Sequence, residues 1–493
     1  MSFSRRSFLL GAGGGLSLLA LTACTDGTPT PVPTTGTADP TPQAVPRPAG
    51  IERSGWSRDS FSLGSHSFVP AGGNPDSRVA LAVPLIDRVF FAGEATSVDR
   101  AATVVGAQRS GTRVAGEVSA AGETGERIAV IGAGVAGVEA ARLLNVYGFD
   151  VVVLEAQDRV GGRIYSLTAD DWPVPAQLGA WSFATTADAE FLSELDRLTI
   201  DTAPIEGALY RAADATASDA DSDDASADPA DDIIENTVGI AALATAVEWA
   251  TQQVTDPSLQ LALDESGATD AASGQSIDDL DGTQLLGQHL AALAATTGAA
   301  ASDLSSWYGV PATSTDPEDT TDAPPERVAV VGDLAQVIDT ALEGVETFLS
   351  TSVVGIAYSD DGVSLRLGTG ESLSVDRVVV TVPLGVLQND VIEFEPLLPF
   401  GHRSALADLG FGTVNSVWLR FDEPFWSTDA AIWNVIGTDT EISTWYNLQA
   451  ITGEPILVGV VGGAAALRIE ELSDDELVDV ALASLAPFAD LAP

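Results

Sequence analysis

A glycine-rich loop that follows a short apolar run is the part of this sequence best suited to hold a phosphate. The run Ile128–Ile131 leads directly into Gly132, Gly134 and Gly137, and a helical pattern continues through Leu144. Glycines let the backbone approach a pyrophosphate closely, and the amides and dipole of a helix N-terminus favour its negative charge. The spacing therefore predicts a strand, a phosphate-binding turn and a helix, as in one half of a dinucleotide site.

An acidic residue stands where the next strand of such a fold would end. A second apolar run, Val151–Leu154, ends in Glu155, whose carboxylate can accept hydrogen bonds from both hydroxyls of an adenosine ribose. Gly161-Gly162-Arg163 then follows. Strand, helix, acid and the Gly-Gly-Arg turn stand in the register of a dinucleotide-binding site, so the loop is more than an incidental glycine turn.

A segment upstream of this loop resembles the C-terminal, FAD-contacting segment of the flavin-containing amine oxidases. It comprises Arg88–Ser97 (RVFFAGEATS), Ala102–Ala107 (ATVVGA) and Ser110-Gly111. In that family the glycine-rich loop opens the chain, whereas here it comes after this segment. The region Ile51–Pro493 is therefore similar to a circularly permuted member whose original ends are fused through Val118–Glu126. Such a fusion is physically easy, because chain termini usually lie at the surface and often close together.

Further segments carry the same resemblance. The stretch Gln177–Trp181 resembles the one beside the flavin ring, Val378–Leu387 resembles a strand and turn of the family, and Leu409–Asn415 and Phe421–Trp426 resemble strands of its substrate domain. In such proteins the Gly-Gly-Arg turn lies against the diphosphate, and its arginine supplies a fixed positive charge. The resemblance implies FAD contacts at Gly93, Glu94, Thr103, Val104, Gly132, Gly134, Gly137, Glu155, Gly162, Arg163, Gly179, Ala180, Trp181 and Val353.

The reaction that the resemblance implies is oxidation of a C–N bond. A hydride passes from the carbon beside an unprotonated amine to flavin N5, and water hydrolyses the resulting imine to an aldehyde. Dioxygen then reoxidises the flavin and yields hydrogen peroxide. The cofactor carries the difficult chemistry, so the protein is expected to supply orientation, desolvation and electrostatics.

The candidate catalytic positions depart from the family pattern. Ser416 follows the Asn of the Gly-Thr-Val-Asn strand, where the family commonly has a lysine, and the sequence contains no lysine at all. His66 replaces the aromatic residue that forms one wall of the amine cage. The other wall falls on Thr103, and Val105 stands where a histidine is common. The familiar form of amine chemistry therefore requires a modified pocket here.

Two of these positions allow more than one interpretation. His66 could take a proton from a bound ammonium, because the unperturbed pKa of histidine is about 6.5, or it could be a neutral wall of the pocket. Trp56 matches a tryptophan near the flavin and serves either the reaction or packing alone. His289 and His402 stand in a helical stretch and a polar loop, and neither has the neighbours of a metal ligand.

Three functions remain open from the sequence. The first is an FAD-dependent amine oxidase with an altered pocket. The second is a related amino-acid oxidase, or a dehydrogenase that passes its electrons to another acceptor. The third is an FAD-binding surface protein without catalysis. Neither the amine nor the oligomeric state can be derived from dispersed pocket residues.

The N-terminal residues predict export and lipid anchoring. Ser4–Leu10 (SRRSFLL) is a twin-arginine signal, and the apolar run after it is too short to span a membrane. Leu21–Cys24 (LTAC) resembles a lipobox, so the sole cysteine would carry the lipid and no disulfide can form within the chain. Thr25–Pro48 is rich in Thr and Pro, as expected of a tether. We therefore expect a lipoprotein on the outer face of the cytoplasmic membrane.

The charge of the chain argues against a nucleic-acid partner. A formal net charge of −49 arises from 71 acidic and 22 basic residues, whereas phosphate binding needs clustered cations. The acidity could steer cationic amines, but it is spread along the chain, which favours a role in solubility or salt adaptation. The acidic stretch Arg211–Asp232 is predicted to be a solvated loop.

These placements predict an α/β protein with two discontinuous domains. The FAD-binding, Rossmann-like domain gathers residues 76–183 and 326–387, and a substrate domain of mixed sheet and helices gathers residues 51–75, 184–325 and 388–493. Apolar residues recur at helical spacing in Gly239–Thr255, Thr283–Thr297 and Ser473–Leu485. Ser473 and Glu476 form a capping box at the start of the last helix.

Overall fold

The computed structural model describes residues 44–213, 236–277, 280–310, 326–437, 440–489 and 491. Contacts divide the chain into two units, Met1–Thr41 and Pro42–Pro493, and every described residue lies in the second. The twin-arginine signal, the lipobox and Asp214–Asp232 of the acidic stretch therefore lie outside the described residues. Arg211 and Ala212, which were also assigned to that solvated loop, instead end a strand that pairs with a neighbour.

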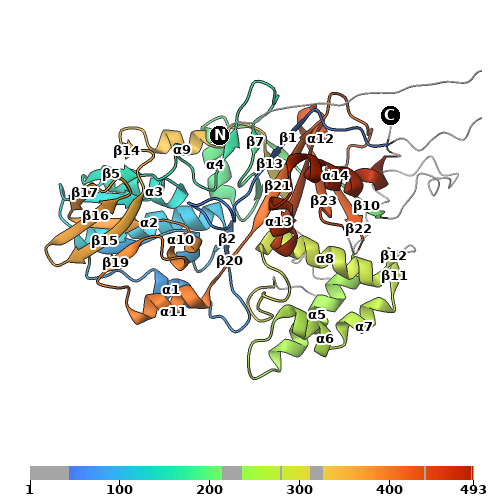
Figure 1. The fold of residues 1–493 in the computed structure, drawn as a ribbon, viewed down its shortest axis with the longest axis horizontal. Coiled ribbons are helices and arrows are strands. Elements are labelled where there is room, and N and C mark those ends of the chain that lie inside the picture. Colours follow the sequence, from blue (N-terminus) through green and yellow to red (C-terminus); the bar gives the residue numbers. More distant parts are fainter. Residues whose placement is uncertain are drawn as a thin grey trace, which may run out of the picture. The chain divides into compact units, whose positions relative to one another are not determined.

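A five-stranded parallel sheet is the first of the two main sheets of the fold (Figure 1). Its order is β14 (Glu346–Phe348), β5 (Asp150–Leu154), β4 (Arg127–Ile131), β18 (Arg377–Val380) and β3 (Val89–Phe91). All neighbours are parallel. Strands of this kind are buried on both faces, which explains their continuous apolar runs. The strands predicted at 128–131 and 151–154 are confirmed.

One face of this sheet is covered by two helices that pack against each other, α2 (Val104–Ala121) and α3 (Val135–Val146). Alternate strand residues, among them Val130 and Val153, share a buried cluster with these helices. The predicted connection Val118–Glu126 is only partly a surface segment. Helix α2 continues to Ala121 and Val118 is fully buried, because its apolar stripe continues into the last turn.

The other face is covered by a smaller sheet and three short helices. The sheet order is β17 (Ser372–Val375), β16 (Gly362–Leu367), β15 (Val353–Ser359) and β19 (Glu393–Glu395). The helices are α1 (Ser77–Leu81), α10 (Leu384–Gln388) and α11 (Phe400–Asp408). Residues up to Leu409 share this cluster, whereas the sequence placed the change of domain after Leu387. His402 was assigned to a polar loop, but it lies buried in α11 beside Phe91.

A six-stranded mixed sheet is the second main sheet of the fold. Its order is β1 (Gly50–Arg53), β21 (Val414–Arg420), β24 (Ile456–Gly462), β23 (Thr444–Asn447), β22 (Ile432–Ile436) and β10 (Ala208–Ala212). Only β10 and β22 pair in parallel. Helices α13 (Gly463–Glu470) and α14 (Asp474–Leu485) cover one face through a cluster rich in tryptophan. The predicted capping box of Ser473 and Glu476 is confirmed.

A helical group lies near the opposite face of this sheet. It contains α5 (Thr237–Thr251), α6 (Leu259–Glu265), α7 (Ala268–Ser273) and α8 (Gly282–Thr297), drawn in yellow-green in Figure 1. Helix α8 contacts β24 and β22, and its predicted bounds are nearly those observed. Helix α5 ends earlier than predicted. The amides of Gln252 and Gln253 donate to the carbonyl oxygens three residues before them, those of Trp249 and Ala250, and this tighter turn closes the helix.

The remaining elements are short. They are β2 (His66–Phe68) paired with β20 (Gly410–Gly412), β6 (Ser166–Leu167) with β7 (Ala176–Gln177), β8 (Ser182–Ala184) and β9 (Thr202–Pro204) with β13 (Arg327–Val330), β11 (Ser276–Ile277) with β12 (Leu280–Asp281), α4 (Ala189–Arg197), α9 (Gln336–Ala341), α12 (Gln449–Thr452), η1 (Glu94–Thr96) and η3 (Ala486–Phe488).

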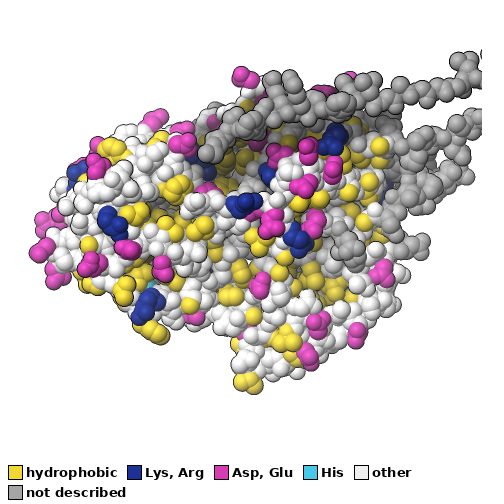
Figure 2. All heavy atoms as spheres, in the orientation of Figure 1, with side chains coloured by type: hydrophobic (Ala, Val, Ile, Leu, Met, Phe, Trp, Pro, Cys, Tyr) yellow, Lys and Arg dark blue, Asp and Glu magenta, His cyan; other side chains and the backbone are white. Residues whose placement is uncertain are grey.

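On the face that Figure 2 shows, acidic side chains are scattered among hydrophobic and basic ones and do not gather in one patch. Within the described ranges, no helix is long and apolar enough to cross a membrane. In the same ranges, no group of three or more His, Cys, Asp or Glu side chains gathers as metal ligands would.

Candidate functional site

The turn between β4 and α3 forms a cradle with space on one side. Gly132 has φ +104°, and a Cβ on Gly137 would lie 2.0 Å from the carbonyl oxygen of Gly132, so neither position accepts a side chain. Gly134 differs: its φ is −78°, and a Cβ there would meet nothing closer than Gly161 O at 4.0 Å. Helix α3 begins without a side-chain cap. Its first amides are therefore available to a ligand over Gly134.

Glu155 lies at the edge of this cradle. Its carboxylate accepts hydrogen bonds from the amides of Ala133 (2.7 Å) and Gln157 (2.8 Å). The side chain is buried, and burial raises its pKa above the ordinary value despite these two amides. An acceptor held in this way at the end of β5 suits a pair of ribose hydroxyls.

The Gly-Gly-Arg turn packs onto the first cradle. The amide of Gly161 donates to Ala133 O at 2.9 Å, and a Cβ on Gly162 would lie 3.4 Å from the Cα of Gly134. Arg163 does not stand free beside this turn. Its Nη1 donates to Ser65 O (2.7 Å) and to Glu94 Oε1 (3.0 Å), so its charge is shared with a buried carboxylate.

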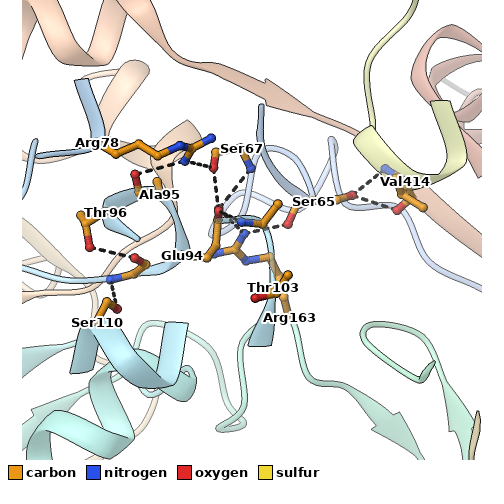
Figure 3. A network of polar contacts seen from close by, with 12 residues as sticks. Ser65, Ser67, Arg78, Glu94, Ala95, Thr96, Thr103, Ser110, Arg163 and Val414 are labelled. Atoms are coloured by element: carbon orange, nitrogen blue, oxygen red, sulfur yellow. Dashed lines mark hydrogen bonds and ion pairs between the residues drawn. The ribbon is translucent and has the colours of Figure 1, made fainter. Parts of the chain in front are cut away.

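Gly93 and Glu94 come from the segment after β3 and meet the same turn. Gly93 has φ +130° and would place a Cβ in open space, while its amide donates to Ser110 Oγ at 2.8 Å. Glu94 also accepts from Ser67 Oγ (2.6 Å) and the amide of Ala102 (2.9 Å) (Figure 3). Burial alone would raise the pKa of Glu94, but Arg163 and Ser67 outweigh it and hold the pKa below its usual range.

Thr103 and Val104 begin α2 next to Glu94. Thr103 is the N-cap: its Oγ1 accepts from the amide of Gly106 at 2.9 Å and donates to Arg100 O at 2.7 Å. Val104 is half-buried and packs against the cluster of the parallel sheet. Both hydrogen bonds of the Thr103 hydroxyl are made within this cap, so the role of Thr103 in the structure is to fix the start of α2.

The stretch Gln177–Trp181 lies beside Arg163. The amide of Ala180 donates to Arg163 O at 3.1 Å, and a Cβ on Gly179 would lie only 2.0 Å from that oxygen. The ring of Trp181 stands edge-on to Tyr446 at 4.7 Å between centroids. Trp172 and Trp418 form a second edge-on pair at 6.3 Å. These pairs belong to one buried cluster between this stretch and the mixed sheet.

Ser416 and Trp418 point from β21 to the same face of the mixed sheet, because side chains two residues apart share a face. Both are buried, and neither Ser416 Oγ nor Trp418 Nε1 has a hydrogen-bond partner. Tyr446 lies on this face too, since it pairs through Val458 with Trp418. A face with unsatisfied polar atoms among aromatic rings is suited to a ligand.

Trp56 ties the two halves of the site together. Its Nε1 donates to Leu178 O at 3.1 Å, and its amide donates to Asn415 Oδ1 at 3.2 Å. Asn415 in turn donates to the buried carboxylate of Glu470 at 2.7 Å. The observed contacts of Trp56 are therefore structural, and they fix the stretch before Trp181 against the residue before Ser416.

His66 is carried by β2, between Ser65 and Ser67, and its Nδ1 is enclosed without a partner. The pKa of His66 is lowered to about 4, chiefly by burial; Glu94 opposes this shift, and Arg163 and Arg78 add to it. The ring is therefore neutral at ordinary pH. Of the two interpretations from the sequence, this favours the neutral wall over the proton acceptor.

Val353 stands apart from these residues. Its side chain is buried in the cluster beneath the parallel sheet, with Ile356 and Leu365. It lies just after Thr351, whose amide donates to Glu155 O at 2.7 Å.

Sequence reasoning missed Tyr446, Trp418, Trp172 and Arg78. For Tyr446 a sequence signal was available: Trp445 and Tyr446 are adjacent aromatic residues, and in a strand they point to opposite faces of the sheet.

Comparison with known proteins decides the family. The model of the flavin containing amine oxidoreductases matches residues 36–119 and 135–492. The chain belongs to this family. This amine oxidoreductase is 29% identical over 386 residues to polyamine oxidase 4 of Oryza sativa subsp. japonica, with 73% of this chain and 72% of that protein covered. It is also 29% identical over 349 residues to lysine-specific histone demethylase 1 homolog 2 of Arabidopsis thaliana, with 70% of this chain and 45% of that protein covered.

Solved structures support the fold of this amine oxidoreductase. A double mutant of putrescine oxidase matches with a TM-score of 0.54 at 21% identity, over 75% of this chain and 83% of that one. Cyclohexylamine oxidase from Brevibacterium oxydans matches with a TM-score of 0.53 at 19% identity, over 72% of this chain and 79% of that one. The predicted α/β fold class is confirmed.

The cofactor of this amine oxidoreductase is FAD, as predicted. The residues present fit that group. Gly134 and Gly93 both face open space where a Cβ would stand, as a backbone must where a diphosphate lies against it. The uncapped amides of α3 suit the phosphates and Glu155 suits the ribose, while orphaned atoms of His66 and Ser416 suit the ring end.

Proposed function

We propose that this enzyme oxidises the C–N bond of a small amine to an imine, which water hydrolyses to an aldehyde, with dioxygen reduced to hydrogen peroxide. FAD, when bound, supplies the acceptor for the hydride of the carbon beside the nitrogen. The observation that carries the proposal is the aromatic pair Trp181 and Tyr446, which lies between the Arg163 turn and the mixed sheet. An apolar wall beside the cofactor cradle suits a neutral amine held out of water.

The protein groups are proposed to orient and desolvate the substrate. Trp181, Tyr446, Trp172 and Trp418 exclude water, which favours the uncharged amine over the ammonium because burial penalises the charged form. The neutral ring of His66 can exchange a hydrogen bond with the nitrogen without adding charge. Thr103 and Trp56 are proposed to act by position alone. The substrate itself, among monoamines, polyamines and amino acids, is the open part of the proposal.

The test is product analysis of the FAD-loaded enzyme with a panel of amines and amino acids. The proposal expects an amine to yield aldehyde and peroxide in equal amounts. A second candidate, a dehydrogenase with another acceptor, is favoured by one observation: Ser416 stands where the family commonly has a lysine, and the sequence contains no lysine to replace it. In that case aldehyde would form only with an artificial electron acceptor. Absence of product from every compound, with either acceptor, would contradict both proposals and leave an FAD-binding surface protein.

We also propose that the chain is a circular permutation, with FAD-binding parts near 76–183 and 326–387 and the rest forming the substrate domain. The two matched segments and the neighbouring places of β3, β18 and β4 in one sheet support this. The two ends of the described chain support it too, because Val45 and Leu491 pack against the same cluster.

Restoring the inferred original order is expected to preserve FAD binding. In such a protein the chain would start at Glu123, and residues 44–121 would follow Leu491 through a short glycine linker. Because only the turn after α2 is cut and the joined ends lie against one cluster, the fold should persist, with FAD bound at native stoichiometry. A rearranged protein that folds, judged by circular dichroism, yet binds no FAD would contradict the permutation.

We further propose that the enzyme is exported by the twin-arginine route and anchored by lipid at Cys24. Replacing Cys24 by alanine is expected to move the protein from the membrane fraction to the soluble fraction, since the sequence offers this one thiol for a lipid. Ser17→Ala, within the apolar run, is the matched control and should stay with the membrane. Changing Arg5 and Arg6 to lysine should block export. A Cys24→Ala protein that remains fully membrane-bound would show that the apolar run is the anchor.

A further inference from the structure

The strand that carries His66 is held from behind by a buried polar network. Ser65, just before β2, and Ser67, within it, flank His66 in extended backbone and therefore face away from its ring. Ser65 Oγ donates to Val414 O at 2.8 Å and accepts from the amide of Val414 at 2.7 Å. Ser67 Oγ donates to Glu94 Oε2 at 2.6 Å. The position of His66 thus depends on what these two serines contact.

Arg78 is the member of this network without a role so far. It comes from α1 and is 4% exposed, and its Nη1 donates to Ser67 Oγ at 2.6 Å and to Ala95 O at 3.2 Å (Figure 3). Both acceptors are neutral, and within the described residues Arg78 forms no ion pair. The buried carboxylate nearby, Glu94, is instead paired with the half-buried Arg163 at 3.0 Å. A buried cation such as Arg78 is expensive and calls for a function.

We propose that Arg78 is a positioning residue for the amine site: its guanidinium fixes Ser67, and through Ser67 the strand of His66, and it adds a positive charge behind that strand. The role of His66 as a pocket wall rests on the proposed function, whereas the position and charge effects do not.

The charges around His66 fix the direction of the expected effect. The groups that act on His66 are Glu94, which raises its pKa, and Arg163 and Arg78, which lower it, while burial lowers it most. Removing the charge of Arg78 leaves Glu94 opposed by Arg163 alone. The pKa of His66 should therefore rise, and the ring should begin to protonate at a higher pH than in the native protein.

The experiment is a pH titration of His66 in the FAD-loaded enzyme by histidine-selective NMR, with His66→Gln to assign the signal. Arg78→Met is expected to move the midpoint upward from about 4, by up to roughly one unit, because Arg78 is the smallest of the charges that act on His66. Arg78→Lys should restore the native midpoint. Arg109→Met, which breaks an exposed ion pair with Asp99, is the control and should change nothing. An unmoved midpoint in Arg78→Met, or an equal shift in the control, would overturn the charge effect.

Ser67→Ala tests position separately, and it remains available if Arg78→Met does not fold. This change cuts the contact between Arg78 and β2 but keeps every charge. The His66 signal should broaden or split as the strand loosens, while its midpoint stays close to the native one. A single sharp signal at the native position would overturn the positioning role. None of these measurements requires turnover, so they hold even if the proposed reaction proves wrong.

Discussion

Replacing Gly134 by valine is expected to weaken FAD binding strongly while leaving the apoprotein folded. The backbone of Gly134 is extended, at φ −78° and ψ 176°, so valine adopts it without strain. The added Cβ meets no protein atom closer than 4.0 Å, and the side chain would occupy the space assigned to the diphosphate. Overpacking typically costs about 1–3 kcal/mol, or roughly 5- to 150-fold in FAD affinity.

Two further glycines make this result interpretable. Gly116→Val, on an exposed position of α2 with no atom within 4 Å of a Cβ, should leave FAD affinity unchanged. Gly137→Val should disturb the fold itself, because its Cβ would lie 2.0 Å from Gly132 O. FAD affinity by titration and thermal unfolding without FAD separate the three outcomes. Native FAD affinity in a folded Gly134→Val protein would show that the diphosphate lies elsewhere.

Replacing Ser416 by lysine is expected to accelerate reoxidation of the reduced flavin by oxygen. Negative charge develops near the flavin ring in that step. One positioned hydrogen-bond donor at such a charge is typically worth about 2.7–4 kcal/mol, or 10²–10³ in rate, and we expect a gain of this order from a fixed cation in a water-excluded site. Ser416 is 5% exposed and its Oγ has no partner, so the native position supplies neither charge nor an engaged hydroxyl. The reductive half-reaction should change little.

The matched control is Ser416→Met, which adds similar length without charge and should not accelerate reoxidation. Burial lowers the pKa of a lysine, so the gain of Ser416→Lys should fade as the pH rises through that lowered pKa. Stopped-flow measurement of both half-reactions decides the matter. If the native enzyme already reoxidises as fast as the lysine variant, another group supplies the charge. His66 is then a poor choice, because its pKa of about 4 leaves it neutral.

Local features could be predicted from the sequence because their physical causes are local. The β4 strand, the glycine turn and the start of α3 follow from a few neighbouring residues. The capping box of α14 needs only Ser473 and Glu476, and both of its hydrogen bonds are present. The FAD cradle is of the same kind, since glycine spacing alone limits where the backbone can approach a diphosphate.

Features that depend on distant pairing could not be predicted in the same way. Trp181 and Tyr446 meet because the register of β23 and β24 turns Tyr446 to the same face as Trp418. Arg163 was expected to supply a fixed positive charge, and its pairing with Glu94 at 3.0 Å arises only because folding brings the two segments together. Arg78 carries no sequence signal at all, because its partner Ser67 lies on a different element and only the fold buries both.

Anaerobic addition of amines to the FAD-loaded enzyme, with flavin absorbance recorded, shows whether this enzyme oxidises amines. We predict that at least one amine bleaches the flavin completely, with one substrate consumed per FAD. We also predict slower bleaching when deuterium replaces hydrogen on the carbon beside the nitrogen, because that bond breaks in the step. If no amine or amino acid bleaches a flavin that dithionite reduces normally, the chain binds FAD without oxidising amines, which contradicts the proposed function.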